Sequence, residues 1–302
     1  MRLRFLFLAT AVLGRLFAAD TQPRTLLLDG AVVGSTLVAV GERGTIFRST
    51  DNAATWQAAS SLASATLTGV TFAPESPRGW AVGHDALILT SGDTGATWQK
   101  SYQGESLNDS FLDVLALDPQ RVIAIGAYGL YVTTADGGKT WQRRKVIDDD
   151  YHLNRISRGP TGTLYLAGEH GTLLRSADQG ATWTRIPAAY EGSFYGILAL
   201  DKRTLLAHGL RGHVFRSIDD GATWTAIPTA QPVLLAASLQ LKSNFLVLAG
   251  HARVLLVSRD YGKSAKQWDA TMTTAIAELL ETPDGRILAL GEAGATLLDP
   301  PK

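Results

Sequence analysis

The chain has 302 residues, and 45% of them are hydrophobic, which is enough for a large apolar core. Its 28 basic and 28 acidic side chains give no formal net charge, which argues against a nucleic-acid binder that depends on overall positive charge. The lack of cysteine excludes a disulfide framework and a lipid-attachment site on cysteine. Thirty glycines and seven tryptophans are typical of an all-β protein with many tight turns and packed aromatic rings.

The first 19 residues have the anatomy of a secretory signal peptide. Arg2 and Arg4 form a basic start, residues 3–13 are nearly all apolar, and small residues follow at Ala18 and Ala19. Arg15 departs from this pattern, and an uncleaved anchor is the alternative, although the run is too short to span a bilayer well. We therefore predict that the protein is periplasmic or otherwise exported, with a single domain over residues 20–302.

From residue 37 onward, one strand–glycine–strand pattern recurs seven times. Each copy is a short apolar strand that ends in glycine, then two variable residues, then a second strand, as in IAIGAYGLYVTT over residues 123–134. The glycines of successive copies lie 41 to 43 residues apart. The repeated glycines are Gly41, Gly83, Gly126, Gly168, Gly209, Gly250 and Gly291. This period and content predict a seven-bladed β-propeller with about four short strands in each blade.

The third repeat illustrates the strands that we expect in a blade. They are an inner strand over residues 112–117, a second over 121–126, a third over 129–134 and an outer strand over 140–144. The seventh repeat ends with the chain at Lys302, before an outer strand. Either residues 20–25 supply that strand or the seventh blade keeps three strands.

A second motif, Ser/Thr-x-Asp-x-Gly-x-Thr-Trp, joins the third strand to the outer strand. Complete copies lie at residues 91–98, 134–141, 176–183 and 217–224, and the first and sixth repeats carry degenerate copies. The aspartate can accept backbone N–H groups across the turn, the glycine permits a positive φ, and the tryptophan packs between blades. Because copies spread around a ring cannot converge on one ligand, we predict a structural turn and not a binding site.

These turns resemble the Asp-box, or BNR, repeat. Together with WAVG at residues 80–83 and GGKTW at residues 137–141, they are similar to the photosystem II stability/assembly factor family over most of residues 25–299. The resemblance implies a non-catalytic propeller that helps membrane-protein subunits to assemble. The implied partner is a protein, namely a membrane protein or its periplasmic segment. We expect a monomer that binds no nucleic acid. Peripheral association of the protein with a membrane is compatible with this prediction.

The alternative is a sialidase-like propeller that binds or hydrolyses glycans. Such an enzyme needs three arginines that bind a carboxylate, a Tyr–Glu pair that acts as nucleophile and base, and an aspartate that acts as the acid. The Arg-Ile-Pro at residues 185–187 falls at a repeat position that reads Ala-Ile-Pro at residues 226–228. His84, His152, His170 and His251 lack close metal-ligand spacing, and no phosphate-binding loop is present, so we expect no cofactor and no metal. We therefore expect that the protein is not an enzyme.

The predicted binding surface lies on the face opposite the Asp turns, where the second-to-third-strand turns and the blade-linking loops emerge. Turn residues vary there from blade to blade, and the loop over residues 143–158 is rich in arginine. We expect the four arginines to form a basic patch, unless the aspartates at 148–150 neutralise them. Residues that begin inner strands are expected at the channel mouth. The predicted protein-binding residues are Arg143, Arg144, Arg155, Arg158, His152, Asn154, Tyr128, Glu169, His170, Arg211, Phe111 and Tyr195.

Overall fold

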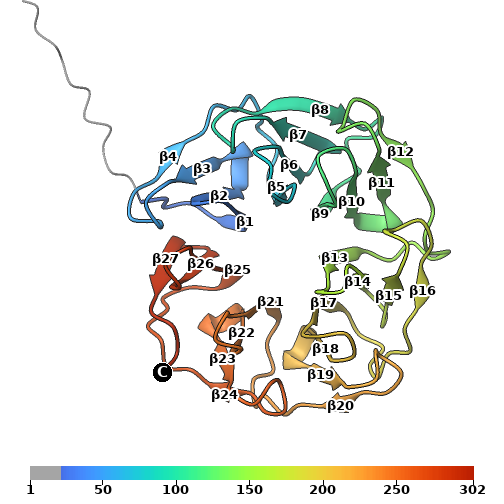
Figure 1. Cartoon of the computed structure of the whole chain (residues 1–302), viewed down its shortest axis with the longest axis vertical. Coiled ribbons are helices and arrows are strands. Elements are labelled where there is room, and N and C mark those ends of the chain that lie inside the picture. The colour runs from blue at the N-terminus through green and yellow to red at the C-terminus, as the bar shows by residue number, and fades with distance from the viewer. Residues whose placement is uncertain (1–21) are drawn as a thin grey trace, which may run out of the picture.

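The computed structural model describes residues 22–302, which form seven antiparallel sheets arranged as a ring (Figure 1). Each sheet is one blade, and the blades are numbered one to seven along the chain. Six blades have four strands, and blade seven has three. The predicted all-β, seven-bladed propeller is therefore confirmed, while the predicted signal peptide lies outside the described residues.

Within each blade the strands run in chain order from the axis to the rim (Figure 1). The inner strands are β1 (Leu27–Val33), β5 (Leu67–Phe72), β9 (Phe111–Ala116), β13 (Leu153–Arg158), β17 (Phe194–Ala199), β21 (Leu235–Gln240) and β25 (Ile276–Glu281). The second strands are β2 (Thr36–Gly41), β6 (Gly79–Gly83), β10 (Val122–Gly126), β14 (Leu164–Gly168), β18 (Leu205–Gly209), β22 (Leu246–Gly250) and β26 (Ile287–Gly291).

The third strands are β3 (Ile46–Ser49), β7 (Leu87–Ser91), β11 (Tyr131–Thr134), β15 (Leu173–Ser176), β19 (Val214–Ser217), β23 (Leu255–Ser258) and β27 (Gly294–Leu298). The outer strands are β4 (Gln57–Ala58), β8 (Gln99–Gln103), β12 (Gln142–Arg143), β16 (Thr184–Arg185), β20 (Thr225–Ala226) and β24 (Lys266–Gln267). Short 3₁₀ turns join the second and third strands in four blades: η1 (Glu42–Gly44), η2 (Ala127–Gly129), η3 (Leu210–Gly212) and η4 (His251–Arg253). In blade three the expected strands are correct to within two residues, except that the outer strand is only two residues long.

The repeated glycine ends every second strand because the backbone of the inner strand passes too close for a side chain. A Cβ atom on Gly126 would lie 2.1 Å from the carbonyl oxygen of Ser110, the residue before β9. The same carbonyl accepts a hydrogen bond of 2.9 Å from the N–H of Ala127. An equivalent backbone carbonyl blocks the Cβ position of all seven repeated glycines. The glycine thus allows the turn after it to be fastened to the start of the inner strand.

The Asp turns are held together by bonds within each turn, as the sequence predicts. In blade four, Asp178 accepts hydrogen bonds from the backbone N–H and the hydroxyl of Thr182, at 2.8 and 2.6 Å. Ser176 donates to Asp178 at 2.7 Å and accepts from the N–H of Gly180, whose φ is +85°. The degenerate copies keep these bonds. In blade six, Ser264 takes the place of the threonine and donates to Asp260. In blade one, Ala53 takes the place of the glycine, at a φ of 64°, and its N–H donates to Ser49.

Apolar side chains fill the spaces between neighbouring blades. The indole of Trp183 in blade four donates to the hydroxyl of Tyr131 in blade three at 3.2 Å, in line with its predicted place between blades. Blades seven and one close the ring in the same way, with Leu288 and Leu290 packed against Leu27 and Leu37. Of the two closures that the sequence left open, the described residues show the one with a three-stranded blade seven.

Candidate functional site

The inner strand of every blade has a β-bulge at the same position. In β13, for example, Leu153 pairs with Gly168 and Arg155 pairs with Ala167, so Asn154 is the extra residue. The same shift occurs between the first and third residues of all seven inner strands. A bulge changes the direction in which neighbouring side chains point. Here the first residue is buried between blades, whereas the second faces the axis of the ring.

The second residues of the seven inner strands line one cavity of about 410 Å³, which we call the mouth cavity. They are Leu28, Thr68, Leu112, Asn154, Tyr195, Ala236 and Ala277. His251 and Glu292, from second-to-third-strand turns, also line it. The cavity therefore opens on the face that carries those turns, which we call the mouth face. The Asp turns lie on the opposite face.

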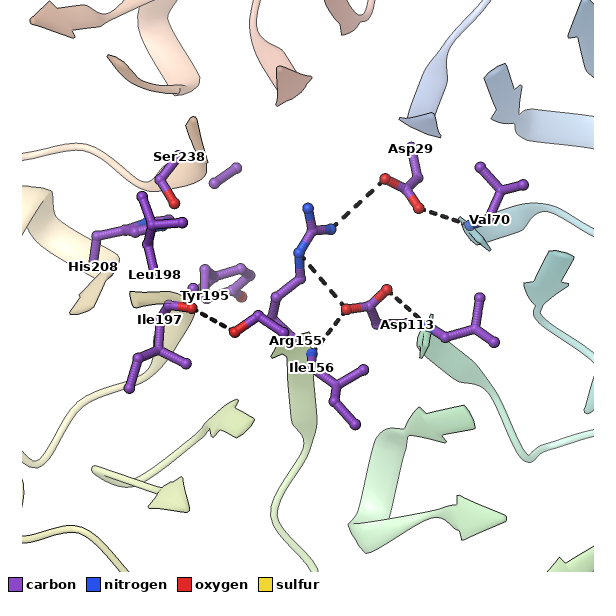
Figure 2. A pocket seen from close by; sticks show the side chains of 14 residues that line it. Asp29, Val70, Asp113, Arg155, Ile156, Tyr195, Ile197, Leu198, His208 and Ser238 are labelled. Atoms are coloured by element: carbon purple, nitrogen blue, oxygen red, sulfur yellow. Dashed lines mark hydrogen bonds and ion pairs between the residues drawn. The ribbon is translucent and has the colours of Figure 1, made fainter. Parts of the chain in front are cut away.

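The third residues of the inner strands form a second ring, which we call the charge ring. It consists of Asp29, Gly69, Asp113, Arg155, Gly196, Ala237 and Glu278. Arg155 in blade four contacts Asp113 at 3.6 Å, Asp29 at 3.8 Å and the carboxylate of Glu278. One guanidinium thus joins blades four, three, one and seven across the axis, and Figure 2 shows the contacts with Asp29 and Asp113.

Hydrogen bonds from the backbone hold these carboxylates in place. Asp29 accepts from the N–H of Val70 in the next blade at 2.7 Å. Asp113 accepts from the N–H of Ile156, also in the next blade, at 2.8 Å (Figure 2). Glu278 accepts from the N–H of Leu279 in its own strand at 2.9 Å. The charge ring therefore fastens neighbouring inner strands to one another as well as binding Arg155.

Burial and charge change the protonation equilibria of the ring. Desolvation raises the pKa of Asp29 well above its usual value, although the positive charge of Arg155 opposes this rise. Desolvation likewise raises the pKa of Asp113, again against the effect of Arg155. Burial disfavours the charged form of Arg155, but the three carboxylates together outweigh it and raise its pKa. For Asp29 and Asp113, the positive charge of Arg155 therefore offsets the effect of burial only in part.

A second cavity of about 250 Å³ lies beside the charge ring, and we call it the axial cavity. Its lining includes Asp29, Asp113 and Arg155 on one side and His208 and Ser238 on the other (Figure 2). It shares Arg155, Tyr195 and Ala236 with the mouth cavity. The two cavities are thus successive levels of one space along the axis.

Four of the predicted binding residues come together on the mouth face between blades three and four. The ring of Tyr128 meets that of His152 edge to face, with centroids 4.9 Å apart. His152 Nδ1 lies 3.7 Å from a carboxylate oxygen of Glu169. His170 stacks on Tyr151 at 4.3 Å. Since Tyr128 is 64% exposed, this group, the aromatic–histidine cluster, offers an accessible surface beside the mouth cavity.

Glu169 also has a structural role that its repeat position reveals. Its carboxylate accepts a hydrogen bond of 2.9 Å from the N–H of His152, the residue before β13. Glu42 and Glu292 make the same kind of bond to Leu26 and Ala275, which precede the inner strands of blades one and seven. Glu169 is therefore a fastening between a turn and an inner strand as well as a member of the cluster.

The structure does not bring the four predicted arginines into one patch. Arg155 belongs to the charge ring. Arg143 forms an exposed ion pair with Asp109 at 3.0 Å. Arg144 donates to the carbonyls of Gly180 and Ala181 in the next Asp turn, at 3.0 and 2.6 Å. Arg158 donates to the carbonyl of Leu117 at 3.3 Å, on the Asp-turn face. The physical reason is that three strand residues separate Arg155 from Arg158, which is about 10 Å.

The residues expected at the channel mouth are confirmed in two cases of three. Asn154 and Tyr195 line the mouth cavity, and Asn154 also donates to the carbonyl of Phe194 in blade five at 2.8 Å. Phe111 does not line it, because it is the first residue of its strand and is fully buried between blades. Leu112, the next residue, lines the cavity where Phe111 was expected. Arg211 is exposed at the tip of η3, in another part of the mouth face.

The sequence prediction missed the three carboxylates of the charge ring. Each stands alone in its own repeat, and nothing in one repeat marks it as a site. A signal was nevertheless present, because the inner strands that begin LLD, FLD, LNR and IAE carry a charged third residue. Among residues 22–302, no group of three or more His, Asp or Glu side chains is arranged to hold a metal ion. No helix in this range is long and apolar enough to cross a membrane.

Comparisons with known proteins agree with this architecture. Residues 100–231 match the model of the family described as photosynthesis system II assembly factor YCF48. The structure of YCF48 bound to D1 peptide has a TM-score of 0.73 and 21% identity, covering 92% of this chain and 94% of that one. YCF48 from Cyanidioschyzon merolae has a TM-score of 0.73 and 15% identity, covering 91% and 95%. The predicted resemblance to photosystem II assembly factor propellers is thus confirmed.

One enzyme also shares the fold. The GH74 xyloglucanase from Xanthomonas campestris has a TM-score of 0.64 and 16% identity, covering 86% of this chain and 50% of that one. At this identity the likeness concerns the fold alone. A search among curated proteins found no match.

Proposed function

We propose that this protein is an exported, non-catalytic propeller that binds a segment of a membrane protein at its mouth face and assists the assembly of that protein's complex. The observation that carries this proposal is the mouth cavity. All seven blades contribute to it, its lining is largely apolar, and an exposed aromatic–histidine cluster lies beside it. Such a combination suits a short peptide segment that needs apolar contact and a few hydrogen bonds.

Two further points support the proposal. The similar protein YCF48 has been solved with a bound D1 peptide, which is a protein ligand. The signal peptide predicted over residues 1–19 would bring the propeller to the periplasm, where segments of membrane proteins are accessible. The ring is fastened between blades by side-chain packing and hydrogen bonds, so we expect a rigid monomer that changes little in shape on binding.

The glycan-active alternative has less support. A sialidase-like site needs three arginines around a carboxylate, but Arg155 is the one arginine among the described residues that line the two cavities. That arginine already contacts three carboxylates and has little capacity for another anion. The arrangement therefore favours binding over this type of catalysis.

The proposal predicts that one exposed residue on the mouth face is needed for capture. The purified protein should retain a membrane protein from a detergent extract of the native membrane, identified by mass spectrometry. Tyr128→Asn should reduce the captured amount by about 10-fold or more, because it removes an exposed ring from the binding face. Asparagine tolerates the left-handed backbone that Tyr128 adopts, with a φ of 54°, so folding should be preserved.

Ile218→Asn is the matched control for this experiment. Ile218 is similarly exposed, at 60%, but it lies in the Asp turn of blade five on the opposite face. Capture by Ile218→Asn should equal that of the wild type. Equal losses in both variants, or a loss in Ile218→Asn alone, would refute binding at the mouth face.

A further inference from the structure

The axial cavity lies beside Gly196, a member of the charge ring in blade five that has no side chain. Other blades place a carboxylate or a guanidinium at this position. The space beside Gly196 is bordered by His208 and Ser238, and Arg155 extends away from it toward Asp29 and Asp113 (Figure 2). The cavity thus has an acidic side and a side that carries neutral hydrogen-bonding groups.

His208 presents an unpaired hydrogen-bond acceptor to this cavity. The residue is 1% exposed, and its Nδ1 lies 3.0 Å from the carbonyl oxygen of Leu235. Because a carbonyl can only accept, Nδ1 carries the proton and Nε2 is an acceptor. Among the described residues, Nε2 has no hydrogen-bond partner. Buried polar atoms without a partner are rare, so this atom points to a ligand that donates a hydrogen bond.

Gly196 makes room for the imidazole of His208 at the wall of the cavity. A Cβ atom at position 196 would lie 2.2 Å from Nε2, in the direction in which residues of the charge ring point. The glycine has an ordinary φ, so the backbone conformation does not require it. Its effect is to leave room for the imidazole, whose unpaired Nε2 lies where a side chain at position 196 would otherwise be.

The charges around the cavity favour a cation over an anion. Three carboxylates and one guanidinium leave two negative charges in excess when all four groups are ionised. Two of these carboxylates, Asp29 and Asp113, line the cavity. Burial raises the pKa of both groups, and the negative charge of Glu278 adds to the rise while the positive charge of Arg155 opposes it. A positive group in the cavity would supply the missing compensation.

We propose that the axial cavity binds a primary alkylammonium group, which donates a hydrogen bond to His208 Nε2 and offsets the charge of Asp29 and Asp113. The group could be carried by a lysine side chain of the segment bound in the mouth cavity or by a free amine. The mouth cavity gives access to it, since the two cavities share Arg155, Tyr195 and Ala236. The lysine form of the proposal rests on the proposed function, whereas the site itself does not.

The test is a titration of the purified protein with n-butylammonium chloride, which mimics the lysine side chain. The ring nitrogens of the six histidines are followed by NMR. One Nε2 resonance, absent from the His208→Leu variant, should move saturably with a Kd of about 1 mM or below. In calorimetric titrations, His208→Leu and Gly196→Ala should each weaken binding by at least about 10-fold. His213→Leu, a change of the same type outside both cavities, should bind like the wild type.

His208→Leu is chosen because the fold already accommodates it. Leu290 occupies the same repeat position in blade seven, where it pairs with the charge-ring residue Glu278. Thermal unfolding of each variant at neutral pH checks that it is folded. The absence of any saturable shift would overturn the proposal. So would binding that is unchanged in His208→Leu, or saturable binding of acetate in the cavity, since acetate would indicate an anion site.

A second arm distinguishes the source of the ammonium group. A capped peptide with one lysine between leucines should bind at least about 10-fold more tightly than n-butylammonium if a bound segment supplies the group, because the leucines would fill the mouth cavity. Equal or weaker binding would assign the site to a free amine. Saturable n-butylammonium binding without capture of any membrane protein would refute the proposed function and leave the site intact. Capture of a membrane protein without amine binding would refute the amine site and leave the proposed function intact.

Discussion

Replacing Arg155 with leucine is expected to lower the free energy of unfolding by about 3 kcal/mol at neutral pH, a typical cost of breaking a buried ion pair. The substitution leaves Asp29, Asp113 and Glu278 without their shared cation, and the side chains of these three residues are only 4–6% exposed. The side chain of Arg155 is 30% exposed, so water already screens part of its charge. For this reason we expect the lower end of the usual range for buried pairs.

The loss should depend on pH in a defined direction. The pKa values of Asp29 and Asp113 are already raised in the folded protein, and removal of the positive charge raises them further. Between the unfolded and the folded pKa of such a carboxyl group, the folded state binds more protons. The difference in stability between the wild type and Arg155→Leu should therefore shrink as the pH falls toward about 4, the usual value for an aspartate, and widen as the pH rises.

Urea unfolding of the wild type and Arg155→Leu at several pH values measures this effect. Arg143→Leu is the matched control, because Arg143 is 60% exposed and forms a single ion pair with Asp109. Its loss should cost less than about 1 kcal/mol at any pH. A small, pH-independent effect of Arg155→Leu would mean that the charge ring does not hold the inner strands together.

The second large effect concerns His208 and acid. Burial, with a smaller contribution from the charge of Arg155, lowers the pKa of His208 to about 4, although its hydrogen bond to Leu235 opposes the shift. An unfolded histidine has a pKa of about 6.5, so between these values the unfolded state binds more protons. The wild type should therefore lose about 3 kcal/mol of stability through this residue as the pH falls from about 6.5 to about 4.

His208→Leu should lack this loss, because leucine does not titrate. The measurement is the difference in free energy of unfolding between the wild type and His208→Leu, taken from urea titrations at pH values across this range. The difference should shift in favour of the variant as the pH falls. Parallel curves for the two proteins would show that His208 is not buried in a neutral form.

The scaffold could be predicted from the sequence because its determinants repeat. Gly126 and its six counterparts are each forced by a backbone carbonyl that leaves no room for a Cβ atom, so the same residue recurs in every blade. The Asp turn recurs for a similar reason, since Asp178 and its counterparts satisfy the same backbone groups each time. Constraints that act within one blade, or between adjacent blades, require the same residue type in each repeat and are therefore visible in the sequence.

The site was harder to predict because its members meet only across the axis. Arg155 and Glu278 are 123 residues apart, and their contact depends on which residue of each inner strand the bulge directs inward. Without that register, Phe111 and Leu112 are equally plausible at the mouth, and only the bulge decides between them. The predicted arginine patch was wrong for a related reason, because the four arginines are close in sequence but lie at different places on blades three and four.

The structure brings together four residues of the predicted binding surface, the aromatic–histidine cluster. Tyr128 and His170 occupy a turn position that varies from blade to blade, and His152 lies in a blade-linking loop, whereas Glu169 recurs in other blades as Glu42 and Glu292. Variation at a fixed position of a regular scaffold was therefore a useful guide to an accessible surface. It did not reveal the charge ring, whose residues lie within the strands.

Hydrogen exchange with and without the captured membrane protein tests most directly the claim that the partner binds at the mouth face. We expect slower exchange of amides in the turns at residues 127–129 and 169–171 and in the loop before β13, and unchanged exchange in the Asp turns at residues 134–141 and 176–183. Protection confined to the Asp turns, or to the outer strands at the rim, would contradict the account.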